Sequence, residues 1–150
     1  MKRLSLTATM ALTTVLSAGI SCAAMADAKS QIKHRMGVME AIGGHFNATI
    51  ATLGGPAEFQ PNHQMHATSI ATLAKIAPKL FPEGSGEGKT KAKAEIWEQA
   101  DQFNASMDDF VVAADALAAA SMNDDMGAYV GAIKGLGKTC KSCHDDFKKK

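Results

Sequence analysis

Two cysteines and a histidine near the C-terminal end have the types and the spacing to hold a covalent cofactor. Cys140 and Cys143 are three residues apart, and His144 follows the second cysteine directly. On a helix, residues three and four apart are neighbours, so all three side chains share one face. The thiols of a Cys-X-X-Cys-His segment attach to the vinyl groups of haem, and the adjacent imidazole can bind the iron. The segment therefore predicts one covalently bound haem c, with His144 as the proximal axial ligand.

Two other uses of a Cys-X-X-Cys pair are weaker in this chain. A thioredoxin-like pair belongs in a βαβ context, and no segment here has the pattern of a parallel sheet. A zinc site needs further ligands at close spacing, whereas the third cysteine, Cys22, is near the N-terminus and the other histidines are far upstream. A thiol oxidoreductase that uses Cys140 and Cys143 stays open as a third functional hypothesis, and it predicts free thiols and no haem.

The N-terminal residues have the pattern of a secretory signal peptide. Basic residues at positions 2 and 3 precede an apolar run of small residues, and Ala24 and Ala26 offer small side chains to a signal peptidase. The run is too short and too rich in Thr, Ser and Ala for a membrane anchor, which is the competing interpretation. We expect residues 1–26 to be removed, Cys22 included. This leaves residues 27–150 as one domain in the periplasm.

The charge of the chain limits the kinds of partner. The whole sequence has a formal net charge of +1, and loss of Lys2 and Arg3 with the leader changes it to −1. Nucleic-acid binding needs a strongly basic surface, so no nucleic-acid partner is expected. Lysines cluster at 89–93 and 148–150, which we interpret as solvated ends or as a docking patch for an acidic redox partner.

No carboxylate pair, nucleophile arrangement or phosphate-binding loop appears, so we predict a carrier and not an enzyme.

Four segments have helical periodicity, and none has a convincing strand pattern. We expect helices over 28–53, 62–80 and 91–120, and a fourth that starts after an Asn123 N-cap and includes Phe147. Glycine- and proline-rich connections separate the first three, and Pro78 should distort or close the second helix near its end. Amphipathic helices with short connections predict an all-α, antiparallel four-helix bundle with the haem inside it.

The apolar residues of these helices recur at steps of three and four, which is the spacing of a buried seam. The expected seams are Ile32, Met36, Met39, Gly43, Phe46, Ile50 and Leu53 in the first helix, Ile70, Leu73, Ala77 and Leu80 in the second, Ile96, Phe103, Phe110 and Leu117 in the third, and Met126, Val130, Ile133, Gly137, Cys140, His144 and Phe147 in the fourth. Because the haem ligand shares its seam with core residues, the haem is expected inside the bundle.

With the helices placed, the chain resembles the class II cytochromes c, which include the cytochromes c′ and the low-spin cytochromes of the c-556 type. The residues that carry the resemblance are Arg35, Met39 and His45-Phe46, Pro78 to Pro82, Ile96-Trp97, and the specific Cys140-Lys141-Ser142-Cys143-His144. The resemblance spans essentially all of residues 27–150. It implies a periplasmic carrier of single electrons, with redox proteins as donor and acceptor, and either a monomer or a homodimer.

The resemblance also raises the question of which group faces the iron opposite His144. In cytochromes c′ an apolar residue of the first helix covers that side, and the high-spin iron binds NO or CO; in the c-556 type a methionine binds the iron. Met39 stands at the matching place, so the leading interpretation is a low-spin electron carrier with His144 and Met39 as axial ligands. The alternative is a high-spin, five-coordinate cytochrome c′. A core-filling role for Met39 also stays open, and Met36 competes with it one turn earlier.

Several other side chains are candidates for supporting roles. Arg35, one turn before Met39, is either a contact for a haem propionate or an exposed surface arginine. Phe147, one turn after the haem ligand, is expected to pack on the proximal side of the haem. Gly43 is interpreted as small because the porphyrin lies flat against its turn. The other histidines are not expected to bind iron, and those at positions 63 and 66 are expected to be exposed.

Overall fold

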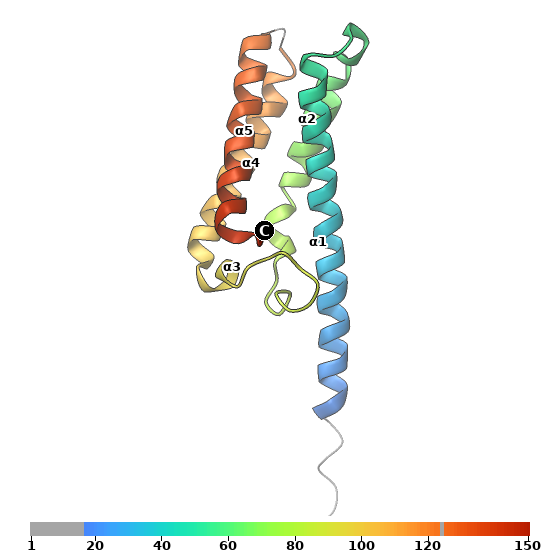
Figure 1. The fold of residues 1–150 in the computed structure, drawn as a ribbon, viewed down its shortest axis with the longest axis vertical. Coiled ribbons are helices and arrows are strands. Elements are labelled where there is room, and N and C mark those ends of the chain that lie inside the picture. Colours follow the sequence, from blue (N-terminus) through green and yellow to red (C-terminus); the bar gives the residue numbers. More distant parts are fainter. Residues whose placement is uncertain (1–16, 124) are drawn as a thin grey trace, which may run out of the picture.

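The computed structural model describes residues 17–123 and 125–150, and in those ranges it is a bundle of helices without a sheet (Figure 1). The long helices are α1 (Ser17–Leu53), α2 (Asn62–Ala74), α4 (Ala100–Ala120) and α5 (Met126–Phe147), and α3 (Glu95–Glu98) is a single turn. Two short 3-10 helices, η1 (Ala57–Phe59) and η2 (Ala77–Leu80), flank α2. The prediction of an all-α four-helix bundle is confirmed.

The four long helices alternate in direction (Figure 1). α1 and α2 pack closely on each other, as do α4 and α5, and α2 also packs on α4. α1 and α5 run antiparallel and meet over a shorter length than these pairs.

The predicted signal peptide lies partly outside the described residues. Residues 1–16 are not described, and the predicted cleavage position after Ala26 lies within α1. The cleavage stays a prediction. None of the helices in the described part of the chain is long and apolar enough to cross a membrane.

The second helix ends early, as Pro78 predicts. α2 stops at Ala74, and the chain continues as η2 with Pro78 near its start. Proline has no N–H to donate, and its ring clashes with the preceding turn, so an α-helix cannot continue through it.

The third predicted helix is wrong in its first part. Residues 91–94 are not helical, and the helix is broken at Gln99 (φ −120°, ψ 49°) between α3 and α4. The backbone N–H of Lys93 donates instead to the carbonyl oxygen of Phe147 at 3.0 Å, and Ala92 forms an isolated antiparallel bridge with Lys148. Pairing with a distant part of the chain has replaced the local helix.

α5 has a different N-cap from the predicted one. The carboxylate of Asp125 accepts a hydrogen bond from the backbone N–H of Ala128 at 3.0 Å. Asn123 donates its side-chain N–H back to the carbonyl oxygen of Ala119 at 3.1 Å, so it closes α4. The prediction of Asn123 as the N-cap is therefore wrong, because this side chain serves the helix before it.

The seam of the third predicted helix is confirmed. Ile96, Phe103, Phe110 and Leu117 are all buried in the core of the bundle.

The buried face of the first helix is rotated about the helix axis from the predicted one. The residues of α1 that are buried are Ile32, Arg35, Val38, Ile42, Thr49 and Thr52.

Three residues predicted for the α1 seam are exposed instead. Met36 and Ile50 are each 46% exposed and Leu53 is 36% exposed. Two of the polar residues on the buried face form hydrogen bonds there: the Thr52 hydroxyl donates to the carbonyl oxygen of Thr49 at 2.7 Å, and Arg35 donates to the carbonyl oxygen of Ser85 at 2.9 Å. Met39 lies at the edge of the buried face and is half-buried.

Candidate haem site

The two cysteines of the motif lie on one face of α5 and touch the core. Cys140 and Cys143 are half-buried and pack against the buried hydrophobic cluster, and neither forms a disulfide. Ile133 and Phe147 of the same predicted seam are buried, but His144 is exposed. The predicted haem ligand is therefore at the edge of the buried face and not at its centre, which corrects the predicted seam of α5. The thiols point inward while the imidazole is accessible beside them.

The protonation of the two thiols does not suit thiol redox chemistry. Burial raises the pKa of Cys140, and burial with the nearby Cys140 and Asp146 raises the pKa of Cys143 to about 11. Thiol oxidoreductases depend on a cysteine with a lowered pKa, so the third hypothesis loses support. Although the His144 side chain is exposed, partial desolvation of its ring on the side that faces the protein, followed by the charge of Lys148, lowers its pKa. The neutral imidazole, which is the form that binds metal, is thereby favoured.

α1 meets α5 at one close contact that sets their register. A Cβ added to Gly137 of α5 would lie 3.3 Å from Cζ of Phe46 on α1. Seven residues are close to two helical turns, so a step of seven returns to nearly the same face of a helix. Because α1 and α5 are antiparallel (Figure 1), a step of seven back from Phe46 along α1 and a step of seven forward from Gly137 along α5 reach the same level of the bundle. Those steps lead from Phe46 to Met39 and from Gly137 to His144. Met39 is thus the α1 side chain at the level of the predicted iron ligand, while Met36 is exposed.

The backbone of α1 beside this pair is open at Gly43. A Cβ added to Gly43, one turn after Met39, would meet no other atom within 4 Å, so packing inside the protein does not require glycine there. The half-buried thiols of Cys140 and Cys143 lie on α5 about one and two turns beyond Gly137. A porphyrin held by two thioethers needs two inward thiols, an adjacent imidazole and an open surface on the facing helix. The residues present fit a covalent haem.

Arg35 is buried, which rules out the expected alternative of a surface arginine. It is only 3% exposed, and its guanidinium lies 4.8 Å from the ring centre of Phe81. It donates hydrogen bonds to the carbonyl oxygen and hydroxyl of Ser85, both at 2.9 Å, to the hydroxyl of Thr90 at 2.8 Å and to the carbonyl oxygen of Leu80 at 3.3 Å. Arg35 therefore fastens the 80–90 loop to α1.

This role of Arg35 was missed in the sequence. The available signal was its spacing, because it lies three residues after Ile32 and three before Val38, both buried. Burial lowers the pKa of its guanidinium, and no carboxylate of the described residues forms an ion pair with it. A buried cation without an anionic partner is costly. A haem propionate stays a candidate for that partner.

Phe147 belongs to a row of aromatic rings in the core. It is 3% exposed and meets Phe103 edge to face at 5.3 Å between ring centres, and Phe103 meets Phe81 in the same way at 4.8 Å. Trp97 covers the loop beside this row, since its ring N–H donates to the carbonyl oxygens of Phe81 and Pro82 at 3.1 and 3.2 Å. The row joins the end of α5 to the loop that Arg35 holds.

The remaining histidines lie away from the motif or are engaged elsewhere. His63 is 8% exposed and stacks on Tyr129 with 4.7 Å between ring centres, so the expectation that it is exposed is wrong. His66 is half-buried, and its Nδ1 is 3.0 Å from Nδ1 of His45. His34 is exposed. Within the described ranges no three His, Cys, Asp or Glu side chains converge to hold a metal ion.

Comparisons with known proteins converge on one family. The family model described as Cytochrome C' matches residues 30–148. The cytochrome c′ of Pararhodospirillum photometricum is 36% identical over 124 residues, which cover 82% of this chain and 99% of that protein. The cytochrome c-556 of Agrobacterium fabrum strain C58 is 35% identical over 140 residues, which cover 93% and 94%. Both types of relative therefore share about a third of their residues with this chain.

Solved structures are similar over the same range. Cytochrome c prime from Shewanella frigidimarina superposes with a TM-score of 0.76 at 31% identity, and the match covers 82% of this chain and 97% of that one. A ferrous variant of cytochrome c prime from Alcaligenes xylosoxidans with bound NO superposes with a TM-score of 0.74 at 25% identity, covering 82% and 96%. The structural likeness thus extends over the whole bundle.

Proposed function

We propose, on the premise that the chain belongs to the cytochrome c′ family, that its haem is attached through Cys140 and Cys143 and that His144 binds the iron. Members of this family carry one covalent haem c and serve in electron transfer. The haem supplies a one-electron iron couple and, where the sixth position is open, a site for a small gas. The observation that carries the proposal is the pair of inward, unpaired thiols with an accessible imidazole beside them.

For the distal side we propose the cytochrome c′ arrangement, with high-spin iron that binds NO or CO opposite His144. The relatives named cytochrome c′ and the NO-bound structure support this alternative better than the leading expectation of a low-spin carrier. Met39 then serves as an apolar cover for the distal side. Its flexible, unbranched thioether is suited to a cover that adapts to a small ligand.

A low-spin carrier with His144 and Met39 as axial ligands is the second candidate. The observation that favours it is the register of α1 on α5, which brings these two side chains to one level. The similarity to a cytochrome c-556 supports it as well. A thioether ligand would raise the reduction potential relative to two histidines, and it would leave no position for a gas.

The other residues take supporting parts in the same proposal. Arg35 holds the 80–90 loop and is positioned to offer its positive charge to a haem propionate. Phe147 packs in the aromatic row behind the motif. The chain acts in the periplasm after removal of residues 1–26, and redox proteins there are its electron donor and acceptor. It acts as a monomer or a homodimer.

Haem attachment is tested first, on a denaturing gel stained for covalent haem. The parent protein should stain, and a double Cys140→Ser and Cys143→Ser variant should not. A parent protein without stain, and with thiols that react freely, would overturn the proposal in favour of the thiol oxidoreductase.

The distal side is tested by the visible spectrum of the purified holoprotein, oxidised and reduced, before and after addition of CO. The cytochrome c′ proposal expects a high-spin spectrum that shifts with CO. A low-spin spectrum without a CO response would support the second candidate, and Met39→Ala should then convert it to high spin. Met36→Ala, at an exposed position one turn earlier, is the matched control and should leave the spectrum unchanged.

A further inference from the structure

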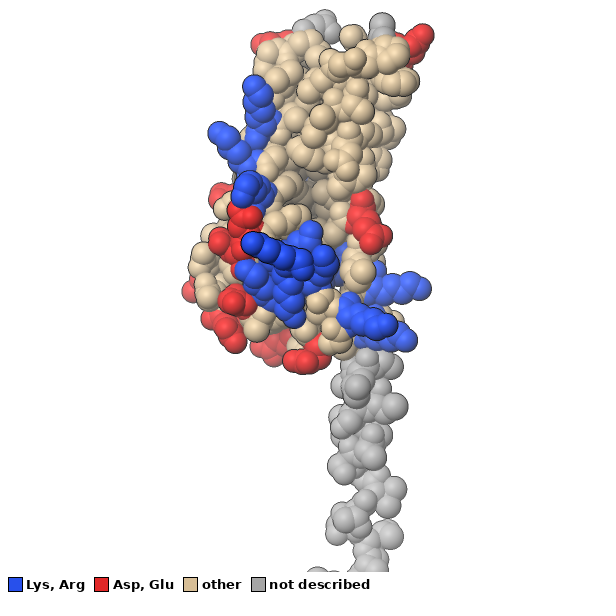
Figure 2. All heavy atoms as spheres, viewed as in Figure 1, with Lys and Arg blue, Asp and Glu red and all other residues tan. Residues whose placement is uncertain are grey.

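Two lysine-rich segments that are far apart in the sequence lie together in the structure. The backbone N–H of Lys149 donates to the carbonyl oxygen of Lys91 at 2.8 Å, and that of Lys93 donates to the carbonyl oxygen of Phe147 at 3.0 Å. Together with the bridge between Ala92 and Lys148, these bonds hold the C-terminal tail antiparallel to residues 91–93. Figure 2 shows the result as one group of basic side chains at the C-terminal end of α5.

Among the described residues no carboxylate forms an ion pair with an exposed lysine of this group, although Asp145 is near, since Lys141 and then Lys150 lower the pKa of its carboxyl. We define the basic patch by its exposed members, Lys89, Lys91, Lys148, Lys149 and Lys150. Within the described residues, the ion pairs are Lys75 with Asp115 and Lys141 with Asp145, and neither includes a member of the patch. Lys93 is not counted as free, since its Nζ donates to the carbonyl oxygens of Asp145 and Asp146 at 2.9 and 2.7 Å.

The pairing of the two segments places like charges directly across from each other. In an antiparallel bridge at Ala92 and Lys148, Lys91 stands opposite Lys149. Like charges at opposite positions of an antiparallel pair repel and are destabilising. An anionic surface bound to these two lysines would reduce that repulsion. The whole chain is nearly neutral, with a formal net charge of +1. The patch is therefore a local concentration of charge and not a sign of general basicity.

The patch begins one turn beyond the predicted iron ligand. The backbone N–H of Lys148 donates to the carbonyl oxygen of His144 at 3.2 Å, which makes the patch continuous with the last turn of α5. A partner seated on these lysines would stand beside the motif that holds the haem. The backbone bonds to residues 91–93 hold the backbone of the tail in place before a partner arrives, so only the lysine side chains have to be ordered on binding.

We propose that the basic patch is the docking surface for an acidic face of a redox partner protein, and that it guides this partner to the haem-bearing end of α5. The inference rests on the proposed function for the role of the haem, but the charge arrangement stands without it. Complementary charges raise association rates by roughly 10- to 1,000-fold at low salt, and the effect weakens as the Debye length shortens.

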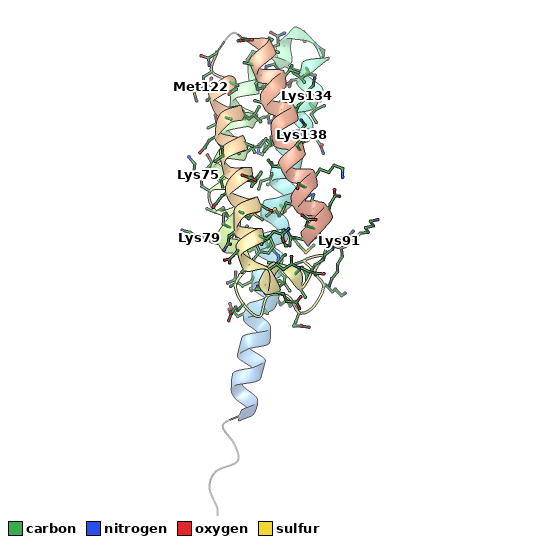
Figure 3. All side chains as sticks on the ribbon, turned by 90° about the vertical axis from the view of Figure 1, so that its left-hand side faces the viewer. Lys75, Lys79, Lys91, Met122, Lys134 and Lys138 are labelled. Carbon is green, nitrogen blue, oxygen red and sulfur yellow. The ribbon has the colours of Figure 1, made fainter. Side chains whose placement is uncertain are left out.

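The test compares two double variants that remove the same charge. Lys91→Gln with Lys149→Gln alters the patch without touching its backbone hydrogen bonds. Lys75→Gln with Lys79→Gln is the matched control, because Lys75 and Lys79 are exposed and lie on the other side of the molecule from Lys91 in Figure 3. Poly-L-glutamate serves as the acidic macromolecular probe, and its binding to each holoprotein is followed by titration calorimetry at low and high salt.

A second readout follows the rate at which the reduced holoprotein gives one electron to hexacyanoferrate(III) or to a cationic cobalt(III) complex. The patch variant should bind poly-L-glutamate several-fold more weakly, should react more slowly with the anionic oxidant and should react faster with the cationic one. The control should differ little from the parent, and all differences should shrink as salt is added.

Equal losses in both variants, or none in either, would overturn the proposal. Binding to vesicles of anionic lipid without binding to poly-L-glutamate would overturn it as well, since the patch would then recognise a membrane surface. Because the calorimetric readout does not depend on redox chemistry, normal binding with no electron transfer would count against the proposed function and not against the patch.

Discussion

The ring of Phe46 on α1 lies against the backbone of Gly137 on α5, so closely that a Cβ at position 137 would be 3.3 Å from its Cζ. This contact sets the register of two helices that meet over only a short length. Two turns away along both helices, the register brings Met39 to the level of His144. In the proposed site, the group that faces the iron would thus depend on a glycine outside the motif.

A larger residue at position 137 should separate the two helices. Gly137→Leu is expected to lower the free energy of unfolding by about 1–3 kcal/mol, the usual cost of overpacking, measured by urea unfolding of the holoprotein. It should also alter the visible spectrum, because Met39 is displaced from the level of His144. Gly135→Leu is the control, since a Cβ there meets nothing within 4 Å. Equal effects of the two substitutions would contradict the assigned register.

Loss of Arg35 should release the 80–90 loop. Arg35→Leu removes four hydrogen bonds and strands buried acceptors, which should cost about 3 kcal/mol or more in unfolding free energy. Amide hydrogen exchange should accelerate at residues 80–90 before it does in α4. Thr90→Val, which removes one of the four partners, should have a smaller effect. If the loop stayed protected without Arg35, its contacts with Trp97 would have to hold it instead.

The cap of α5 can be tested with two neighbouring substitutions. Asp125→Ala should reduce stability by about 1 kcal/mol, because the N–H of Ala128 loses its acceptor at the start of the helix. Asn123→Ala removes only a bond from the exposed end of α4 and should cost less. Thermal unfolding of both variants measures the difference. A larger loss at Asn123 would restore the N-cap predicted from the sequence.

The His45 and His66 pair should make the protein sensitive to mild acid. Burial, and then the charges of His45 and His63, lower the pKa of His66 from its ordinary value of 6.5. The unfolded chain therefore binds this proton first, and the free energy of unfolding should fall as the pH drops below 6.5. His66→Asn should reduce this pH dependence between pH 7 and 5, as measured by urea unfolding. The same substitution at exposed His34 should not.

Local patterns in the sequence were sufficient where the physics is local. The seven-residue recurrence of Phe103, Phe110 and Leu117 predicted the buried face of α4, because one stripe of a helix faces the core whatever it packs against. Pro78 predicted the end of α2, because a missing N–H stops a helix in any fold.

Local patterns failed where a group had more than one possible partner. Asn123 had the side chain of an N-cap, but it bonds backward to α4. The first turn predicted for the third helix does not form, because its backbone groups bond to the C-terminal segment instead. The N–H of Lys93 donates to the carbonyl oxygen of Phe147, and the carbonyl oxygen of Lys91 accepts from the N–H of Lys149. The buried face of α1 was misjudged because Arg35 is polar, and only its partners in the 80–90 loop make its burial acceptable.

The sequence by itself determined the chemistry of this protein, since the order of Cys140, Cys143 and His144 sets which atoms can hold a haem, and helical spacing sets their common face. The tertiary structure alone decided what surrounds that chemistry. It placed Met39 level with His144 and joined two lysine segments beside the motif. Spacing along a chain reports neighbours within one helix, whereas the register between helices and the pairing of remote segments arise from contacts that no local pattern records.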